Sequence, residues 1–261
     1  MMNLVTNKFN ITTNPYTQGI HQHKSNPIKL TIFKGNLEKK ETDKLLRVLK
    51  AKDEYFYKHS LAVEQYSTNL ALAYAEKTML KNPDNFIENI KLAAKLHDIG
   101  KLRFPDSLLV TKNIPKEAKP EEYVKSKANL SEEKRKAIEK HSKDGQKFLM
   151  VNPLFHHIAK IVRHHHEDWD GSGYPSKLKR KEIPIESRII RITDSFDSMV
   201  SKRPYWQECT LEQAMNRLNE EKSKKFDPEL TDLFLEIVPK LYHRVEKEIY
   251  KHESKQLDLL A

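Results

Sequence analysis

The sequence repeatedly combines an apolar helical stripe with a histidine or a carboxylate, and this combination limits the folds that it can adopt. In residues 86–96, apolar side chains recur at the three- and four-residue spacing of one helix face, and His97 and Asp98 follow them. A histidine beside an aspartate is costly in a protein core unless a partner such as a metal ion compensates the charge. One such pair alone is more often explained by a core histidine that is hydrogen-bonded to a neighbour.

Four further stripes show the same feature, and together the five favour a shared metal centre over isolated core histidines. These stripes carry His59, His141, the pair His165 and His166, and the pair Asp194 and Asp197. Helices that all direct such residues inward predict an all-helical protein. Mixed imidazole and carboxylate candidates are too numerous for a single ion, which indicates two metals. The seven candidate ligands are His59, His97, Asp98, His141, His165, His166 and Asp194.

A loop with an unusual composition follows the pair His165 and His166. It reads Glu-Asp-Trp-Asp-Gly-Ser-Gly-Tyr-Pro over residues 167–175. Its two glycines permit backbone angles that are closed to other residues, and Pro175 fixes its own φ angle. We therefore expect a loop of defined shape directly after a metal-bearing helix.

These motifs, in this order, resemble the HD-GYP domain of bacterial cyclic di-GMP phosphodiesterases, within the HD phosphohydrolase superfamily. The likeness runs from about residue 43 to about residue 239. A His-Asp pair alone is shared by many phosphohydrolases, whereas His-His-Glu followed by Asp-Gly-x-Gly-Tyr-Pro is highly specific. The motifs are His59, His97-Asp98 with Lys101, His141, His165-His166-Glu167, Asp170 to Pro175, Asp194, Arg203-Pro-Tyr205 and Phe226-Asp-Pro228.

The resemblance implies an all-α HD-domain bundle around a binuclear metal centre. One metal would be held by His59, His97 and Asp194, and the other by His141, His165 and His166, with Asp98 bridging both. A histidine-rich ligand set favours iron or manganese, and zinc also suits it. Some family members hold a third metal with a glutamate one turn before the first histidine. That position is Tyr55 here, which favours two metals, although the adjacent Glu54 is a second candidate.

The resemblance also implies an activity, hydrolysis of cyclic di-GMP to pGpG, GMP or both by a metal-bridging hydroxide. Asp98 and Lys101 would be the catalytic residues, Lys101 as a donor to the phosphate or the leaving oxygen. We expect Glu167 and Asp170 to orient the imidazoles, and His156, His157 and His164 to be surface or packing residues. Substrate contacts are expected from Lys101, Gly173, Tyr174, Asp197, Arg203 and Trp206.

Two alternative functions stay open. The first is a related phosphohydrolase that acts on another nucleotide, such as a mixed cyclic dinucleotide. The second is a non-catalytic receptor that binds cyclic di-GMP or a diguanylate cyclase partner. Degenerate receptors usually lose ligands, and none is missing here. At Trp206, stacking on a purine and packing into the core are both consistent with the sequence.

Composition adds limits on partners and compartment. The net charge of +10 comes from 47 Lys and Arg against 37 Asp and Glu. Because the lysines are spread along the chain, a solvated surface explains this charge and no DNA partner is expected. A single cysteine, Cys209, excludes an internal disulfide and suits a reducing cytoplasm. The sequence has no apolar run long enough to span a bilayer, and its polar first thirty residues do not read as a signal peptide.

The chain divides into an N-terminal extension (1–40), the HD-GYP domain (41–240) and a charged C-terminal helix or tail (241–261). Residues 28–32 alternate in polarity and precede Gly35-Asn36, so a short strand or hairpin is expected in the extension. The proline-containing segment Thr111–Ala128 is expected to be a loop, either a lid or a decoration. Helices are expected near residues 40–51, 53–79, 85–102, 131–149, 153–166, 185–202, 210–221 and 228–252.

Overall fold

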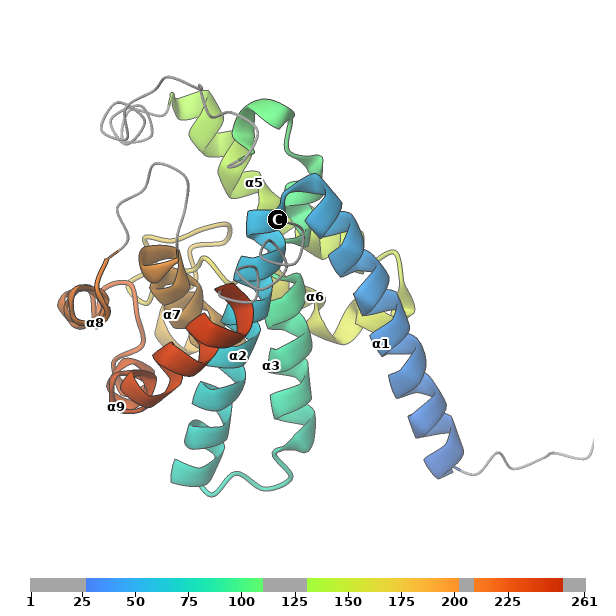
Figure 1. The fold of residues 1–261 in the computed structure, drawn as a ribbon, viewed down its shortest axis with the longest axis horizontal. Helices are drawn as coiled ribbons and strands as arrows, with labels where there is room; N and C mark the ends of the chain where they lie inside the picture. The colour runs from blue at the N-terminus through green and yellow to red at the C-terminus, as the bar shows by residue number, and fades with distance from the viewer. Residues whose placement is uncertain (1–26, 110–130, 202–208, 251–261) are drawn as a thin grey trace, which may run out of the picture.

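The computed structural model describes residues 27–109, 131–201 and 209–250, and these ranges form a bundle of helices (Figure 1). Apart from an isolated bridge between Lys222 and Phe226, no β-pairing occurs in these ranges. The predicted all-α fold is therefore confirmed. The α-helices are α1 (Pro27–Lys52), α2 (Glu54–Lys77), α3 (Asp84–Leu96), α5 (Glu132–Leu149), α6 (His156–Arg163), α7 (Ile185–Val200), α8 (Leu211–Glu220) and α9 (Pro228–Val245).

Short helical turns complete the described chain. They are the 3-10 turns η1 (Ile99–Arg103), η2 (Asp106–Leu108), η3 (Pro153–Phe155) and η4 (Arg180–Glu182), and the π-helical turn η5 (Glu246–Tyr250). No described helix is long and apolar enough to cross a membrane.

Side-chain caps set where several helices begin. Asp53 accepts the backbone N–H of Tyr55 at the start of α2, and Asp227 accepts those of Glu229 and Leu230 at the start of α9. Thr210 and Gln213 form a reciprocal capping box on α8. Because a cap satisfies N–H groups that lack partners inside the helix, these residues mark helix starts that a sequence can reveal.

Helix α2 lies in the middle of the bundle and packs against α1, α3, α7 and α9 (Figure 1). Two apolar clusters share it. The first joins α2 to α7 and α9 through edge-to-face rings, with 5.1 Å between the centroids of Tyr66 and Phe196 and 5.2 Å between those of Phe196 and Phe234. The second joins Val63 of α2 to Leu96, Leu149 and Ile158 from α3, α5 and α6. On α2, the candidate ligand His59 lies N-terminal to Val63 and Tyr66.

The strand or hairpin expected at residues 28–32 is wrong, since α1 runs through them and through Gly35. A strand needs a neighbour to pair its backbone groups, and no strand exists in the described ranges, whereas a helix satisfies those groups itself. Residues 241–250, the described part of the expected C-terminal helix or tail, are helical. Leu241 and Val245 are buried in the bundle, and Tyr250 reaches Asp197 of α7 with a hydrogen bond of 3.1 Å.

The helix expected over residues 85–102 is interrupted at the His-Asp pair. Helix α3 ends at Leu96, and the chain continues through Asp98 (φ −95°, ψ 6°) into η1. The interruption brings Gly100 against α5, where an added Cβ would lie 2.0 Å from the His141 carbonyl oxygen. Only glycine permits this approach, which joins the segments carrying His97 and His141.

A glycine-to-alanine substitution at this contact tests its importance. We expect Gly100→Ala to lower the free energy of unfolding by about 1–3 kcal/mol, because the backbone of α5 must move away. Gly35→Ala is the matched control, since a Cβ there meets nothing within 4 Å and α1 should gain about 0.5–1 kcal/mol. Urea unfolding of both variants measures the difference. Equal stability of Gly100→Ala and the wild type would contradict this account of the turn.

Candidate metal centre

The structure brings all seven predicted ligand candidates into one buried site. His59 comes from α2, His141 from α5 and Asp194 from α7, while the two histidine-containing pairs follow the ends of α3 and α6. His166 is partly exposed, and the other six side chains are buried. The candidates therefore converge although the chain separates them by up to 135 residues.

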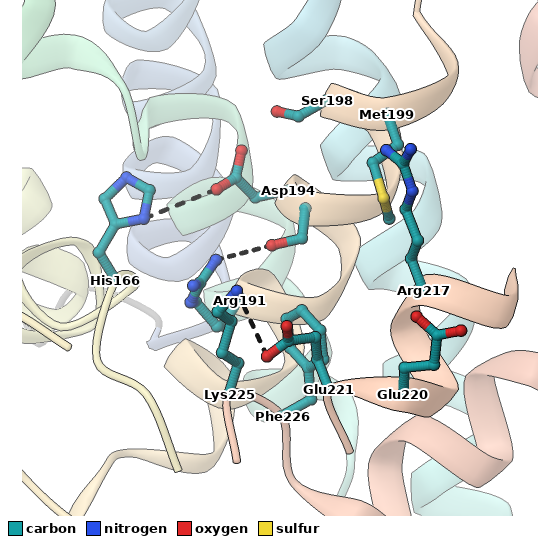
Figure 2. Close-up of a pocket in the computed structure, with 11 residues that line it drawn as sticks. His166, Arg191, Asp194, Ser198, Met199, Arg217, Glu220, Glu221, Lys225 and Phe226 are labelled. Atoms are coloured by element: carbon teal, nitrogen blue, oxygen red, sulfur yellow. Dashed lines mark hydrogen bonds and ion pairs between the residues drawn. The ribbon is translucent and has the colours of Figure 1, made fainter. Parts of the chain in front are cut away.

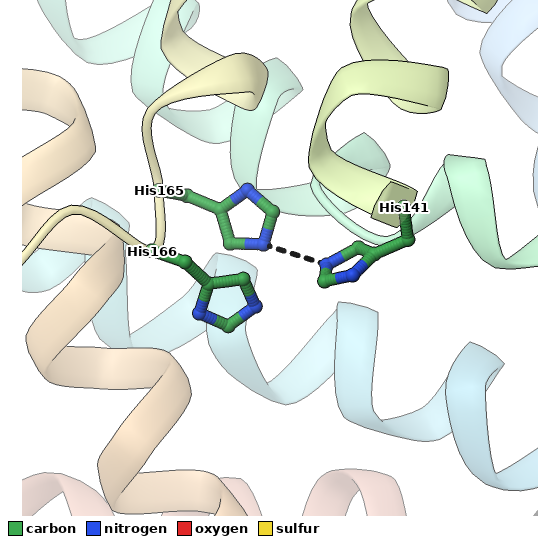
Figure 3. Close-up of side chains that lie close together, drawn as sticks. All are labelled: His141, His165 and His166. Carbon is green, nitrogen blue, oxygen red and sulfur yellow. Dashed lines mark hydrogen bonds between the residues drawn. The ribbon is translucent and has the colours of Figure 1, made fainter. Parts of the chain in front are cut away.

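The candidates form two groups with Asp98 between them. Ligand atoms of His59, His97 and Asp98 lie within 4.8 Å of one another, as do those of His141, His165 and His166 (Figure 3). Asp98 Oδ2 lies 3.5 Å from His97 Nε2 and 3.9 Å from His59 Nε2. Asp98 Oδ1 lies 3.4 Å from His141 Nε2. Each group is thus faced by one oxygen of the same carboxylate.

Three imidazoles are oriented by backbone carbonyls so that Nε2 points into the site. The Nδ1 atoms of His97, His141 and His165 lie 2.8, 2.6 and 2.6 Å from the carbonyl oxygens of Ala94, Ile138 and Val162. A carbonyl only accepts, so each Nδ1 carries the proton and each Nε2 keeps a lone pair. This is the tautomer in which Nε2 binds a metal.

Several nitrogen and oxygen atoms that point into the site have no hydrogen-bond donor from the described residues. His141 Nε2 and His165 Nε2 lie 3.2 Å apart, so two lone pairs face each other (Figure 3). His97 Nε2 and Asp98 Oδ1 are buried without a hydrogen-bond partner among the described residues. Buried acceptors without donors are costly, and a cation between them removes the cost. The donor set therefore fits divalent metal binding.

Burial keeps most of these imidazoles neutral, which ligation requires. It lowers the pKa of His97, lowers that of His141 to about 4, and holds that of His165 well below its usual range. Burial alone would raise the pKa of Asp98, but His97 and Lys101 hold it well below its usual value. Lys101 Nζ lies 2.5 Å from Asp98 Oδ2.

His59 differs because two carboxylates flank its ring. Its Nδ1 lies 2.7 Å from Asp197 Oδ2 and its Nε2 lies 3.0 Å from Asp194 Oδ1. Burial lowers the pKa of His59, but the bonds to Asp194 and Asp197 outweigh it and raise the pKa to about 9. A cation at Nε2 would displace the proton that now bonds to Asp194.

Asp197 orients His59 through their hydrogen bond, and its expected substrate contact stays a prediction. It is completely buried, and its carboxylate also accepts hydrogen bonds from Ser201 Oγ at 2.6 Å and from the Tyr250 hydroxyl. Both oxygens of Asp197 thus accept hydrogen bonds from protein groups.

The Gly-Tyr-Pro loop is held by residues whose roles differ from those expected. Glu167 accepts the backbone N–H groups of Ser176 and Leu178 at 2.7 and 3.1 Å and pairs with His164, so it shapes the loop and orients no candidate ligand. Asp170 is exposed and closes a turn by accepting the N–H of Ser172.

Asp168 and Arg191 form a bridge that the sequence motifs did not reveal. Arg191 Nε and Nη2 donate to Asp168 Oδ1 at 2.9 and 2.7 Å, which ties the loop to α7. The two residues are 23 positions apart with no shared spacing pattern, so the sequence gives no signal of the pair.

The expected loop contacts lie beside the second histidine group. The ring centroids of Tyr174 and His166 are 4.8 Å apart. A Cβ at Gly173 would lie 2.2 Å from the backbone nitrogen of Asp168, so the loop needs glycine there. Gly173 and Tyr174 line a cavity of about 330 Å³ together with lysines of α5. The described residues do not include two expected substrate contacts, Arg203 and Trp206, or the expected loop Thr111–Ala128.

Two residues bear on a third metal. The Tyr55 ring stacks on His59, with centroids 5.7 Å apart and planes 10° apart. Glu54 is half-exposed and lies 3.8 Å from Lys50 Nζ and 3.9 Å from Lys58 Nζ. Glu54 therefore faces surface lysines, which favours two metals.

A larger pocket of about 590 Å³ adjoins the candidate centre between α7 and α8 (Figure 2). His166 and Asp194 form its inner wall, and Arg217 and Glu220 of α8 lie on the opposite side. The pocket provides space for a ligand whose reacting group lies at the metal centre.

Comparisons with known proteins agree with this geometry. An HD domain is recognised over residues 45–230. The chain is 36% identical over 174 residues to a cyclic di-GMP phosphodiesterase of Thermotoga maritima, covering 65% of this chain and 43% of the relative. It is 31% identical over 209 residues to a cyclic di-GMP phosphodiesterase response regulator of Xanthomonas campestris, covering 79% and 50%.

A third relative is named for a different substrate. The chain is 34% identical over 184 residues to a 3′3′-cGAMP-specific phosphodiesterase of Vibrio cholerae, covering 68% of this chain and 30% of the relative. The chain thus spans half or less of the length of these three curated relatives.

Solved structures support the fold. A cyclic GMP-AMP specific phosphodiesterase of Vibrio cholerae matches with a TM-score of 0.55 at 17% identity, covering 82% of this chain and 52% of that chain. An HDG"Y"P protein from Bdellovibrio bacteriovorus matches with a TM-score of 0.50 at 20% identity, covering 69% and 51%. The helical arrangement is therefore shared with HD-domain proteins.

Replacing the central carboxylate tests whether the two groups form one centre. We expect Asp98→Asn to lower bound metal from about two ions per chain to below one, because both groups lose their shared anion. Metal analysis by mass spectrometry measures this. Asp144→Asn is the matched control, since Asp144 is also buried but belongs to neither group. Full metal content in a folded Asp98→Asn protein would contradict a shared centre.

Proposed function

Because the chain belongs to the HD-domain family, in its HD-GYP branch, we propose that it is a metal-dependent phosphodiesterase that hydrolyses cyclic di-GMP. The observation that carries this proposal is the position of Asp98, with one oxygen facing each of two histidine groups. Binuclear sites with such donors are typical of enzymes that displace an oxygen at phosphorus.

The ligand roles follow from the two groups. His59, His97 and Asp194 would hold one metal, His141, His165 and His166 the other, and Asp98 both. We favour iron or manganese for this set, with zinc as the next candidate. When bound, a divalent metal pair lowers the pKa of water and neutralises charge on phosphate oxygens.

Lys101 is the chain's own donor at this centre. Its ammonium lies against Asp98 and 4.8 Å from the centroid of the Phe56 ring, and its side chain is 18% exposed. The lysine is therefore held at the rim, where it can donate to a phosphate oxygen or to the leaving 3′ oxygen. Tyr174, packed on His166, would limit the access of water from the loop side.

The proposed product is linear pGpG, with GMP after a second cleavage. A second candidate substrate is a mixed cyclic dinucleotide, because one relative is named for 3′3′-cGAMP. A non-catalytic receptor is less consistent with the site, since all seven candidate ligands converge. Regulation by a diguanylate cyclase or another partner, and action in the cytoplasm, stay predictions.

Product analysis tests the activity. Protein loaded with Fe²⁺ or Mn²⁺ should convert cyclic di-GMP to pGpG, as followed by liquid chromatography. Lys101→Ala should lower kcat about 100-fold or more while keeping its metal, because the lysine is a donor and not a ligand. Binding of cyclic di-GMP without cleavage by metal-loaded wild type would favour the receptor function instead. Loss of metal from Lys101→Ala would contradict the role given to this lysine.

A further inference from the structure

The pocket between α7 and α8 contains charged groups of both signs in balance. Among the described residues that line it, the cations are Arg191, Arg217 and Lys225, and the carboxylates are Asp194, Glu220 and Glu221. A subsite for a phosphate needs an excess of cations. A balanced set of donors and acceptors instead suits a neutral polar group, such as a nucleobase edge.

Several charged groups of the pocket are already paired with other side chains. Arg191 donates to Asp168 through two nitrogens and to Ser195 Oγ at 2.6 Å, and its guanidinium lies 5.5 Å from the centroid of the buried Phe226 ring (Figure 2). Lys225 is likewise paired with Glu221 at 3.3 Å. Because these charged groups already bond to other side chains, they are less available to a ligand. We therefore expect the side chains on the opposite side of the pocket to make the specific contacts with a ligand.

The outer side carries a guanidinium and a carboxylate on successive turns of α8. Arg217 and Glu220 are three residues apart, both are exposed, and both line the pocket opposite His166 and Asp194 (Figure 2). Met199 of α7 also lines the pocket and offers a polarisable surface for an aromatic ring. A ligand with phosphorus at the metal centre would extend a base toward this side.

Guanine matches this pair of side chains. Its O6 and N7 atoms accept hydrogen bonds from arginine, and its N1–H and N2–H₂ groups donate to a carboxylate. Adenine places the N1 lone pair where guanine has a donor, so a carboxylate repels it. We propose that this pocket is the guanine subsite of the chain, with Arg217 and Glu220 as specificity-determining residues. The inference rests on the proposed function, because it places the scissile phosphate at the metal centre.

The test compares cyclic di-GMP with cyclic di-IMP, which lacks only the N2 amino groups. Wild type should prefer cyclic di-GMP about tenfold in kcat/KM, because Glu220 accepts from N2. Glu220→Gln should abolish this preference, since it replaces one accepting oxygen by an amide donor. Glu212→Gln is the matched control: it makes the same charge change on α8 outside the pocket, and it should keep the wild-type preference.

The outcomes separate the subsite from the activity. If the protein cleaves neither ligand, the ratio of their dissociation constants replaces the ratio of kcat/KM values. The subsite can therefore be tested even if the protein has no phosphodiesterase activity. Loss of the preference in Glu220→Gln but not in Glu212→Gln supports the subsite. An unchanged tenfold preference in a folded, metal-loaded Glu220→Gln protein overturns it, as does a wild type that does not distinguish the two ligands.

Discussion

The structure depends on one buried carboxylate, Asp98, that faces two groups of imidazoles. An anion that is 1% exposed is stable only when cations or donors compensate it. Lys101 compensates one oxygen, and the other has no hydrogen-bond partner within the part of the chain that the structure describes. Four other chain segments bring candidate ligands to the site of Asp98. The imidazoles of His97, His141 and His165 are neutral there, and a pair of divalent cations would complete this arrangement.

Local backbone features make that convergence possible. The chain leaves α-helical geometry at Asp98, and Gly100 then packs directly against the backbone of α5. Two of the carbonyls that orient imidazoles, those of Ala94 and Val162, belong to the last turns of α3 and α6. Carbonyls there lack helical partners, so a histidine just after a helix can use them at no loss of backbone bonding. Ligand orientation is thus linked to where the helices end.

The sequence predicted the helices and the seven converging residues because both leave regular patterns, an apolar stripe and an inward polar residue on it. Other features leave no such pattern. Asp194 and Asp197 occupy the same face of α7 and both bond to His59. The sequence does not reveal that Ser201 and Tyr250 also bond to Asp197. Glu167 follows two histidines but bonds to backbone N–H groups nine and eleven residues later. The alternating polarity of residues 28–32 is compatible with a strand. These residues are helical in the structure, and the described ranges contain no strand with which they could pair.

The most direct test of the central claim is to locate metal relative to Asp98. Crystals of the protein loaded with Mn²⁺ and measured at the manganese absorption edge would show each ion as an anomalous peak. The account predicts two peaks, one beside each histidine group, each about 2.0–2.3 Å from a different oxygen of Asp98. A single peak, or peaks that lie away from Asp98 in metal-replete crystals, would contradict it.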